Sequence, residues 1–221
     1  MQLYFVRHGK TKWNLEGRYQ GSHGNSPLLP ESYEDIKKLA KHLNASGVEF
    51  KAIYTSPLKR ASDTAINLNK SLQKSSPIIT DERLKEFNLG KLEGMKFVDA
   101  EKNYPAQIKA FRYHPDRYDP SAFGGENFSE LIHRSRSLIE EIAKKYPGED
   151  DKVLIVSHGA ALVALIQSLL GTKLADLRSQ GGLVNTSLSI VSTNDQGVSF
   201  QPVVWNQTDY LQKKLEATDI I

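Results

Sequence analysis

Apolar and polar positions along the chain follow two patterns, short apolar runs and longer segments with helical spacing. Two of the apolar runs, residues 3–6 and 153–156, are each followed by one polar residue and then by a histidine and a glycine. Residues 31–43 illustrate the second pattern, with apolar side chains three and four positions apart along one helix face. The chain therefore predicts buried strands that alternate with amphipathic helices.

The same patterns can be followed to the end of the chain. Strands are predicted at residues 3–6, 50–55, 77–79, 153–156, 188–192 and 198–204. Helices are predicted at residues 31–43, 61–72, 127–146 and 160–170. Strands and helices in alternation favour a mostly parallel sheet that is covered on both faces. We therefore expect an α/β fold, a three-layer αβα sandwich.

Residues 81–125 break this alternation. They combine charged residues, three prolines and a Gly124-Gly125 pair without a clear period. We interpret this stretch as a small excursion over the C-terminal ends of the strands, a partial cap. At 221 residues a single domain is the default, so we expect one domain over residues 1–221 with the cap inside it.

Composition and charge limit the class of protein. The formal net charge is +3, from 29 basic and 26 acidic residues, which is too small an excess to indicate a nucleic-acid partner. No cysteine is present, so disulfides and thiolate chemistry are excluded. The first strand leaves no room for a signal peptide, and no apolar run approaches the roughly 20 residues of a membrane span. We expect a cytoplasmic protein that binds neither nucleic acid nor membrane, with its oligomeric state left open.

The two strand–histidine–glycine units bring His8, with Arg7 beside it, and His158 toward one edge of the predicted sheet. Three interpretations are open: structural histidines, a metal site or a phosphoryl-binding site. The metal site is disfavoured, because a guanidinium stays protonated and repels a cation, and no metal-ligand spacing accompanies either histidine. A phosphoryl site suits the residues, because arginine matches phosphate oxygens bidentately and a neutral imidazole can attack phosphorus.

Further motifs support the phosphoryl interpretation. Arg7-His8-Gly9 with the residues that follow it resembles the opening signature of the histidine phosphatase superfamily, also called the phosphoglycerate mutase-like family. The segments that match, in order along the chain, are residues 7–14, 17–21, 56–65, 84–94, 124–126, 157–159 and 185–187. The resemblance spans nearly the whole chain. One departure is Lys10, which stands where the family usually has an acidic residue.

The resemblance implies a mechanism that needs no metal and no cofactor. His8 would be the nucleophile and form a phosphohistidine. Arg7, Arg60 and His158 would surround the transferring group and stabilise the charge on its oxygens. Glu86 would act as the acid and base, with Glu82 and Glu93 as the neighbouring alternatives.

A second set of residues is expected to bind the phosphate or the substrate, or to brace the loop that does so. This set consists of Thr11, Asn14, Gln20, Gly21 and Gly159. The short excursion and the polar sequence after the last strand favour a phosphatase of small phosphorylated metabolites. The alternatives are a 2,3-bisphosphoglycerate-dependent phosphoglycerate mutase and a catalytically weak module that binds phosphorylated ligands.

Overall fold

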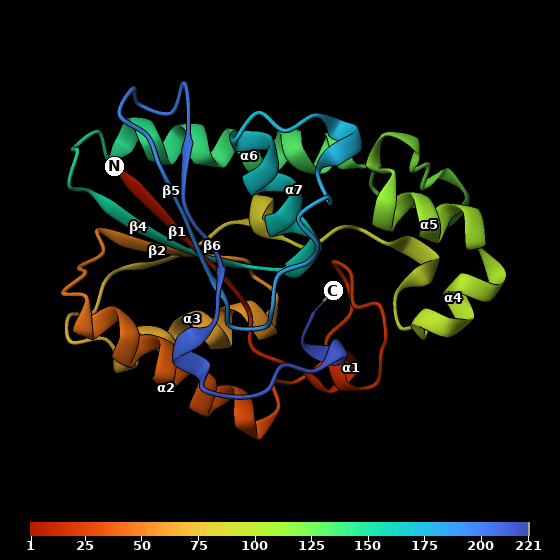
Figure 1. Cartoon of the computed structure of the whole chain (residues 1–221), viewed down its shortest axis with the longest axis horizontal. Coiled ribbons are helices and arrows are strands. Elements are labelled where there is room, and N and C mark those ends of the chain that lie inside the picture. The colour runs from red at the N-terminus through yellow and green to blue at the C-terminus, as the bar shows by residue number, and fades with distance from the viewer. Residues whose placement is uncertain (221) are drawn as a thin grey trace.

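A computed structural model of the protein describes residues 1–220 and shows a six-stranded sheet between two layers of helices (Figure 1). The strands are β1 (Gln2–Arg7), β2 (Ala52–Thr55), β3 (Ile78–Thr80), β4 (Lys152–Ser157), β5 (Leu188–Ser192) and β6 (Gln201–Gln207). They lie in the order β3-β2-β4-β1-β5-β6. The first four of these are parallel, whereas β5 and β6 run antiparallel to their neighbours. The predicted α/β sandwich with a mostly parallel sheet is confirmed.

The helices cover both faces of this sheet. The α-helices are α1 (Lys12–Leu15), α2 (Pro30–Ala45), α3 (Lys59–Ser71), α4 (Phe97–Asn103), α5 (Pro105–Tyr113), α6 (Phe128–Lys145) and α7 (Gly159–Leu169). Helices α2 and α3 cover one face, and α6 and α7 cover the other (Figure 1). None of the helices within residues 1–220 has the length and apolar character needed to cross a bilayer.

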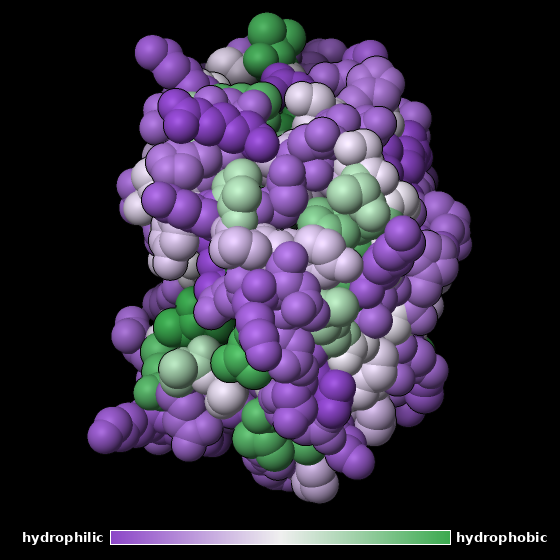
Figure 2. Space-filling model, turned by 90° about the vertical axis from the view of Figure 1, so that its right-hand side faces the viewer, coloured by the Kyte–Doolittle hydropathy of each residue, from purple (hydrophilic) through white to green (hydrophobic). Residues whose placement is uncertain are grey.

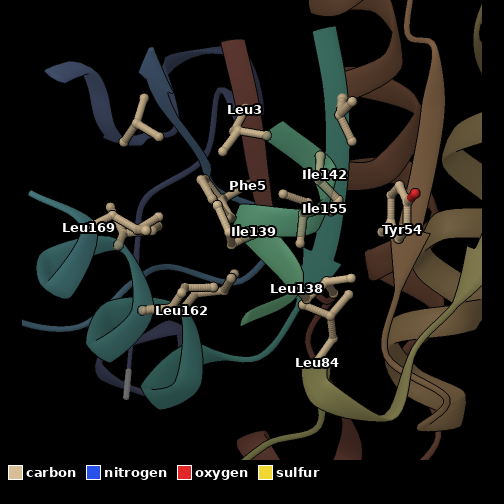
Figure 3. Packing of buried hydrophobic residues seen from close by; sticks show 14 of the residues in the cluster. Leu3, Phe5, Tyr54, Leu84, Leu138, Ile139, Ile142, Ile155, Leu162 and Leu169 are labelled. Atoms are coloured by element: carbon tan, nitrogen blue, oxygen red, sulfur yellow. The ribbon is translucent and has the colours of Figure 1, made fainter. Parts of the chain in front are cut away.

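The core follows from the alternation of side chains along β1. Leu3 and Phe5 point to the α6–α7 face and pack with Leu162 and its neighbours (Figure 3). Tyr4 and Val6 point to the opposite face and pack among the apolar side chains of α2 and α3. Successive residues of a strand face opposite sides, so a strand that is buried on both faces must be apolar throughout. This is the pattern that the sequence shows.

Two parts of the structure differ from the prediction. Helices α1, α4 and α5 were not predicted; of these, α5 begins with Pro105 at its first turn, a favoured position for proline. Strand β6 begins at Gln201 rather than at residue 198. The turn before it is longer because the Asp195 carboxylate accepts hydrogen bonds from the backbone N–H groups of Val198 and Ser199, at 3.1 and 3.0 Å.

Residues 81–125 lie beyond the carboxyl ends of the parallel strands and carry α4 and α5 (Figure 1). Phe87 and Phe111 of this segment pack with Phe128 of α6 and Ala161 of α7 in a third apolar cluster. The face of the molecule on this side is mostly hydrophilic, with small separate hydrophobic patches (Figure 2). The segment is therefore held against the same sheet edge to which the two histidines are delivered.

We expect Leu162→Ala to lower the free energy of unfolding by about 2–5 kcal/mol, because it leaves a cavity between α7 and the sheet. The side chain of Leu162 is fully buried. Leu15→Ala is the matched control, since Leu15 is 52% exposed and its truncation opens no cavity. Denaturant unfolding measures both values, and equal losses for the two variants would contradict this packing.

Candidate active site

The positions of the two histidines follow from the pairing of β1 with β4. These strands are parallel neighbours, with Arg7 opposite Ser157 in the register. His8 and His158 are the next residues, and their ring centroids lie 5.2 Å apart. The backbone N–H of His8 also donates to the carbonyl of Ser157, at 3.0 Å. The structure thus brings the two strand–histidine–glycine units together at one edge, as expected from the sequence.

A small cavity of about 30 Å³ opens at this edge. The charged and polar residues that line it, together with two glycines, are Arg7, His8, Gln20, Gly21, Arg60, Glu86 and Gly159. Aromatic side chains, among them Tyr19, Phe97 and Phe111, form another part of its wall. Four of the five predicted catalytic residues therefore share one cavity. The fifth, His158, touches Arg60 and lies next to His8 without lining it.

The protonation of His8 can be inferred from its hydrogen bond. Nδ1 of His8 lies 2.7 Å from the carbonyl oxygen of Gly9. A carbonyl can only accept, so Nδ1 carries the proton and Nε2 keeps its lone pair. Burial, followed by the charges of Arg60 and Arg7, holds the pKa of His8 well below its usual range. The ring is therefore neutral near pH 7, as a nucleophilic nitrogen requires.

The carbonyl of His8 is also held in place. It accepts a hydrogen bond from the side-chain amide of Asn185, at 3.0 Å. Asn185 belongs to the weakest of the sequence matches and was not predicted as a site residue. It lies 177 positions from His8, so only the fold reveals this contact.

Arg7 is fully buried and only partly satisfied. Its Nη1 donates to the carbonyls of Leu183 and Asp219, while Nε and Nη2 have no partner among residues 1–220. Burial is the main reason why the pKa of Arg7 is lowered to about 10. The guanidinium therefore stays charged at neutral pH. Buried donors without partners are unfavourable, and an anion in the cavity would satisfy them.

Gly159 allows α7 to begin next to this guanidinium. A Cβ at residue 159 would lie 3.0 Å from Nε of Arg7 and 3.3 Å from its Cζ. Real side chains rarely approach so closely, so a larger residue would displace the arginine. The structure thus gives Gly159 a steric role beside Arg7.

Arg60 reaches the site from the first turn of α3 and organises a loop. Its Nη2 and Nη1 donate to the carbonyls of Gly21 and Gly24, at 2.7 and 2.8 Å. Gly21 has φ of +61°, and a side chain there would collide with Glu93. Burial lowers the pKa of Arg60 to about 10, so this residue also keeps its charge. Arg60 therefore supplies charge to the site and fixes the loop that forms one wall.

His158 is neutral as well, which refines the role expected for it. Its Nδ1 accepts a hydrogen bond from Nε of Arg60, at 3.1 Å. Nε2 therefore carries the proton and donates to Oγ of Ser56, at 2.8 Å. Burial, followed by the charge of Arg60, holds the pKa of His158 well below its usual range. Both ring nitrogens of His158 are thus occupied, and the residue acts on the cavity by orienting the guanidinium of Arg60 rather than as a cation.

Glu86 is positioned by the first residues of α7. Its carboxylate accepts hydrogen bonds from the backbone N–H groups of Ala160 and Ala161, at 3.2 and 2.9 Å, and from that of Phe87 at 2.9 Å. A helix N-terminus favours such a negative group. These donors hold the carboxylate in the cavity wall together with His8.

The two alternative acids lie elsewhere. Glu82 is exposed and pairs with Lys85 at 2.6 Å. Glu93 accepts from the backbone N–H groups of Ser22 and His23, at 3.0 and 2.9 Å, and so fixes the loop. Neither glutamate lines the cavity that contains His8. The geometry favours Glu86 as the acid and base.

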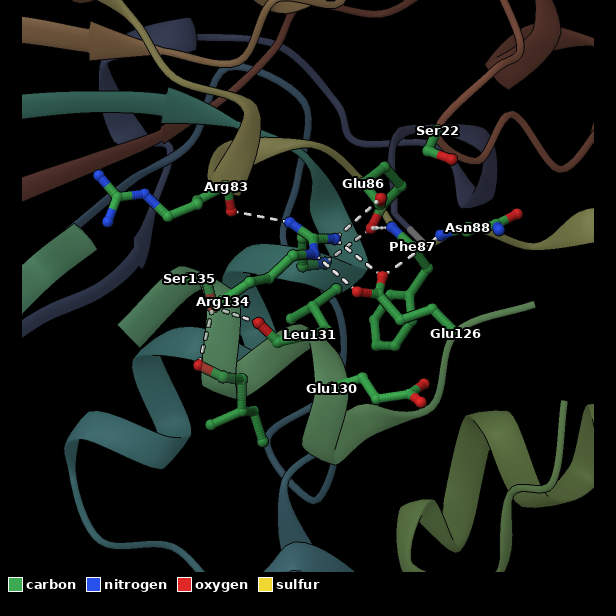
Figure 4. A network of polar contacts seen from close by, with 12 residues as sticks. Ser22, Arg83, Glu86, Phe87, Asn88, Glu126, Glu130, Leu131, Arg134 and Ser135 are labelled. Carbon is green, nitrogen blue, oxygen red and sulfur yellow. Dashed lines mark hydrogen bonds and ion pairs between the residues drawn. The ribbon is translucent and has the colours of Figure 1, made fainter. Parts of the chain in front are cut away.

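A network that the sequence did not indicate supports the backbone around Glu86 (Figure 4). Arg134 of α6 donates to the backbone carbonyls of Arg83 and Glu86, at 2.7 and 3.1 Å. It also pairs with Glu126, with an Nε to Oε1 distance of 2.6 Å. Arg134 and Glu126 thus tie α6 to the segment that carries the candidate acid.

The remaining predicted binding residues differ in their positions. Gln20 lines the cavity, and its buried Oε1 has no partner among the described residues. Thr11 and Asn14 do not line it but form a capping box at the start of α1. Thr11 thus braces the loop, while the buried Nδ2 of Asn14 has no hydrogen-bond partner within residues 1–220. No cluster of three or more His, Cys, Asp or Glu side chains suited to a metal ion occurs in residues 1–220.

Lys10, the departure noted in the sequence, pairs with a distant segment. Its Nζ lies 3.0 Å from the buried carboxylate of Asp219 and 3.1 Å from that of Glu216. The backbone carbonyl of Asp219 is one of the two acceptors of Arg7 and also accepts from the N–H of Asn185. The ion pair therefore helps to hold residues 216–219 beside Arg7.

Comparison with known proteins identifies the family of the chain. The family model for the histidine phosphatase superfamily (branch 1) matches residues 3–208. The chain belongs to this superfamily.

Individual relatives have phosphatase or mutase-like names. The chain is 35% identical to the metal-independent phosphoserine phosphatase of Arabidopsis thaliana, over 88% of this chain and 77% of that protein. It is 29% identical to phosphoglycerate mutase-like protein 4 of the same organism, over 96% of this chain and 87% of that protein. The solved structure of Bacillus stearothermophilus YhfR is similar with a TM-score of 0.86 and 34% identity, over 96% of this chain and 99% of that one.

We expect both buried histidines to keep neutral imidazole rings as the pH falls from 8 to 6. Nitrogen NMR shifts measure this, with His8→Asn and His158→Asn variants to assign the signals. An unfolded histidine takes up its proton near pH 6.5, so each buried neutral ring makes unfolding easier below that pH, by up to about 1.4 kcal/mol per pH unit. A ring that titrates near pH 7 would contradict this electrostatic description.

We expect Lys10→Met to lower the free energy of unfolding by about 3 kcal/mol, because it leaves the buried Asp219 carboxylate poorly compensated. Lys12→Met is the control, since the Lys12 side chain is 66% exposed and lies 3.9 Å from Glu16. Such exposed pairs contribute roughly 0–1 kcal/mol. In the double variant with Asp219→Asn, much of the loss should be recovered. Additive losses would show that the two side chains are not coupled.

Proposed function

We propose that this protein hydrolyses small phosphate monoesters through a phosphohistidine formed on His8, with Glu86 as acid and base and with no metal ion. One observation carries the proposal. The unprotonated Nε2 of His8 belongs to a cavity in which Arg7 has two unpartnered donors and Glu86 supplies a carboxyl group. A nucleophile, an anion-binding group and a proton carrier are thus available to one phosphoryl group.

In the first step the lone pair of Nε2 attacks phosphorus, and an N–P bond forms as the bond to the ester oxygen breaks. Glu86 gives its proton to the departing alkoxide, so a neutral alcohol leaves. Arg7 and Arg60 stabilise the negative charge on the phosphoryl oxygens, and His158 acts by orienting Arg60. Fixed charges of this kind contribute most in phosphoryl transfer, where positioning dominates.

In the second step water replaces the alcohol. Glu86 removes a proton from this water while its oxygen attacks phosphorus. The N–P bond breaks, its electron pair returns to Nε2, and inorganic phosphate leaves. The enzyme is restored with Glu86 protonated for the next turnover.

The names of the relatives support the phosphatase reaction, and some of them support a mutase reaction as the alternative. Similar proteins are named metal-independent phosphoserine phosphatase and broad-specificity phosphatase. Others carry phosphoglycerate mutase names, so a mutase is the second candidate. We further propose a small phosphorylated metabolite as substrate, a cytoplasmic location, no nucleic-acid or membrane partner, and one domain in which residues 81–125 cap the site.

We expect the protein to release phosphate from para-nitrophenyl phosphate in excess chelator. Rapid quenching after exposure to labelled substrate should trap an acid-labile phosphoenzyme. His8→Asn should form none, because it removes the attacking nitrogen, whereas His133→Asn is the control because His133 lies exposed on α6. Glu86→Gln should lower kcat by roughly 10²–10⁴-fold, the range for a lost acid or base.

Each competing function has its own result in these assays. Label on a residue other than His8 would refute the nucleophile assignment. Complete loss of activity on chelation would refute the metal-free mechanism. Conversion of 3- to 2-phosphoglycerate without phosphate release, dependent on 2,3-bisphosphoglycerate, would identify a mutase.

A further inference from the structure

His8 is followed by a glycine whose carbonyl sets the protonation of the imidazole. Nδ1 of His8 donates to this carbonyl of Gly9, at 2.7 Å, so the direction of the carbonyl decides which ring nitrogen carries the proton. A Cβ at residue 9 would lie only 2.8 Å from Cβ of Ser32, so the packing of α2 against this turn requires glycine. Glycine has the greatest backbone freedom of all residues. Other groups must therefore hold the Gly9 carbonyl in place.

Side chains from two distant segments hold both ends of the peptide group between His8 and Gly9. The side-chain amide of Asn185 donates to the carbonyl of His8, at 3.0 Å. At the other end, the backbone N–H of Gly9 donates to Oγ1 of Thr64, which belongs to α3, at 3.1 Å. Asn185 and Thr64 are both completely buried, so bulk water does not compete for these hydrogen bonds.

Both of these residues are themselves held. The hydroxyl of Thr64 donates to the carbonyl of Arg60, one turn earlier in α3, at 2.7 Å. A hydroxyl has a single proton, so toward Gly9 Oγ1 of Thr64 can only accept. Asn185 is fixed by its backbone N–H, which donates to the carbonyl of Asp219 at 2.9 Å. The peptide group that precedes the Gly9 carbonyl thus has a fixed partner at each end.

The residue after Asn185 has a strained backbone. The φ angle of Thr186 is +60°, which a β-branched residue rarely adopts. Its N–H donates to the carbonyl of Arg7 at 3.0 Å, and its own carbonyl accepts from the hydroxyl of Tyr210 at 2.7 Å. Strain of this kind persists only where surrounding contacts enforce it, and it is concentrated at functional sites. The turn that presents Asn185 to His8 is thus formed at a cost in stability.

We propose that Thr64 and Asn185 are positioning residues for the nucleophile. By holding the His8–Gly9 peptide group at both ends, they keep the Gly9 carbonyl directed at Nδ1 of His8 and so keep Nε2 free of a proton. This inference rests on the proposed function, because it takes Nε2 as the attacking atom. Neither Thr64 nor Asn185 lines the cavity of His8, so their contacts serve turnover rather than the binding of phosphate.

The first test removes each contact with little change in shape. In Thr64→Val a methyl group replaces the hydroxyl, and in Asn185→Leu an apolar side chain of similar size replaces the amide. We expect each variant to lower kcat about tenfold, the effect of one lost hydrogen bond, while KM changes less than about threefold. Thr64→Ser should keep most of the activity, because it keeps the hydroxyl. Ser187→Ala is the matched control, since the buried Oγ of Ser187 has no hydrogen-bond partner within residues 1–220.

The second test follows the proton itself. Nitrogen NMR of the unmodified protein should show the proton of the neutral His8 ring on Nδ1. In Thr64→Val and Asn185→Leu part of the population should carry this proton on Nε2 instead, which brings the two nitrogen resonances closer together. Ser187→Ala should leave both resonances in place. A loss of stability alone would not move the resonances of the folded protein.

The proposal is overturned if the resonances are unchanged in both variants, or if the variants raise KM and leave kcat unchanged. Circular dichroism verifies folding, and a variant that does not fold is replaced by alanine at the same position, which removes the same polar atoms. The NMR measurement needs no turnover. If no phosphohistidine forms but the variants move the proton, the positioning role stands and the phosphatase proposal fails. If the unmodified protein releases phosphate while the variants change neither the resonances nor kcat, the reverse holds.

Discussion

The burial of two guanidinium groups is the constraint on which the rest of the site depends. Arg7 and Arg60 are almost completely buried, and within residues 1–220 neither has a carboxylate at ion-pair distance. Backbone carbonyls accept their hydrogen bonds instead, from residues 183 and 219 for one arginine and from residues 21 and 24 for the other. Several loops therefore take their positions around these two charges. The same charges, added to burial, keep both histidines neutral, so the neutral imidazole of His8 and the positive charge of the cavity have a common origin.

The sequence predicted the parts of the molecule that depend on local patterns. Strand ends and amphipathic helices were predicted because spacing and residue type suffice for them, whereas Arg60 and Glu86 were expected at the site through the family resemblance. The supporting contacts could not be predicted in this way. Arg134 binds the carbonyl of a residue 51 positions away, and the partners of Lys10 lie more than 200 positions along the chain. Polar residues on a helix or in a loop give no local sign of which distant carbonyl or carboxylate they will meet, because the fold alone decides it.

The least regular part of the sequence forms part of the cavity wall. Residues 81–125 provide the aromatic side chains of Phe97 and Phe111 to the cavity that contains His8. This segment also carries Glu86, the candidate acid and base, whereas Arg7, His8, Arg60 and His158 come from the ends of the sheet strands and from the starts of the adjoining helices. This division is typical of enzymes in which a rigid scaffold fixes the chemistry and loops select the substrate. A change in the loop segment can thus alter the substrate without moving His8.

The hydrogen bond from Arg7 to the carbonyl of Asp219 spans 212 positions of the chain. A ribosome must release nearly all of the described residues before this bond can form, although Arg7 emerges among the first. Contacts of such long range slow folding, because the chain loses much of its freedom before they contribute. During synthesis the sheet can begin to assemble while the guanidinium still lacks this acceptor. The surroundings of Arg7 are therefore among the last parts of the described chain to form, and a nascent chain with most of its core in place would still lack this acceptor.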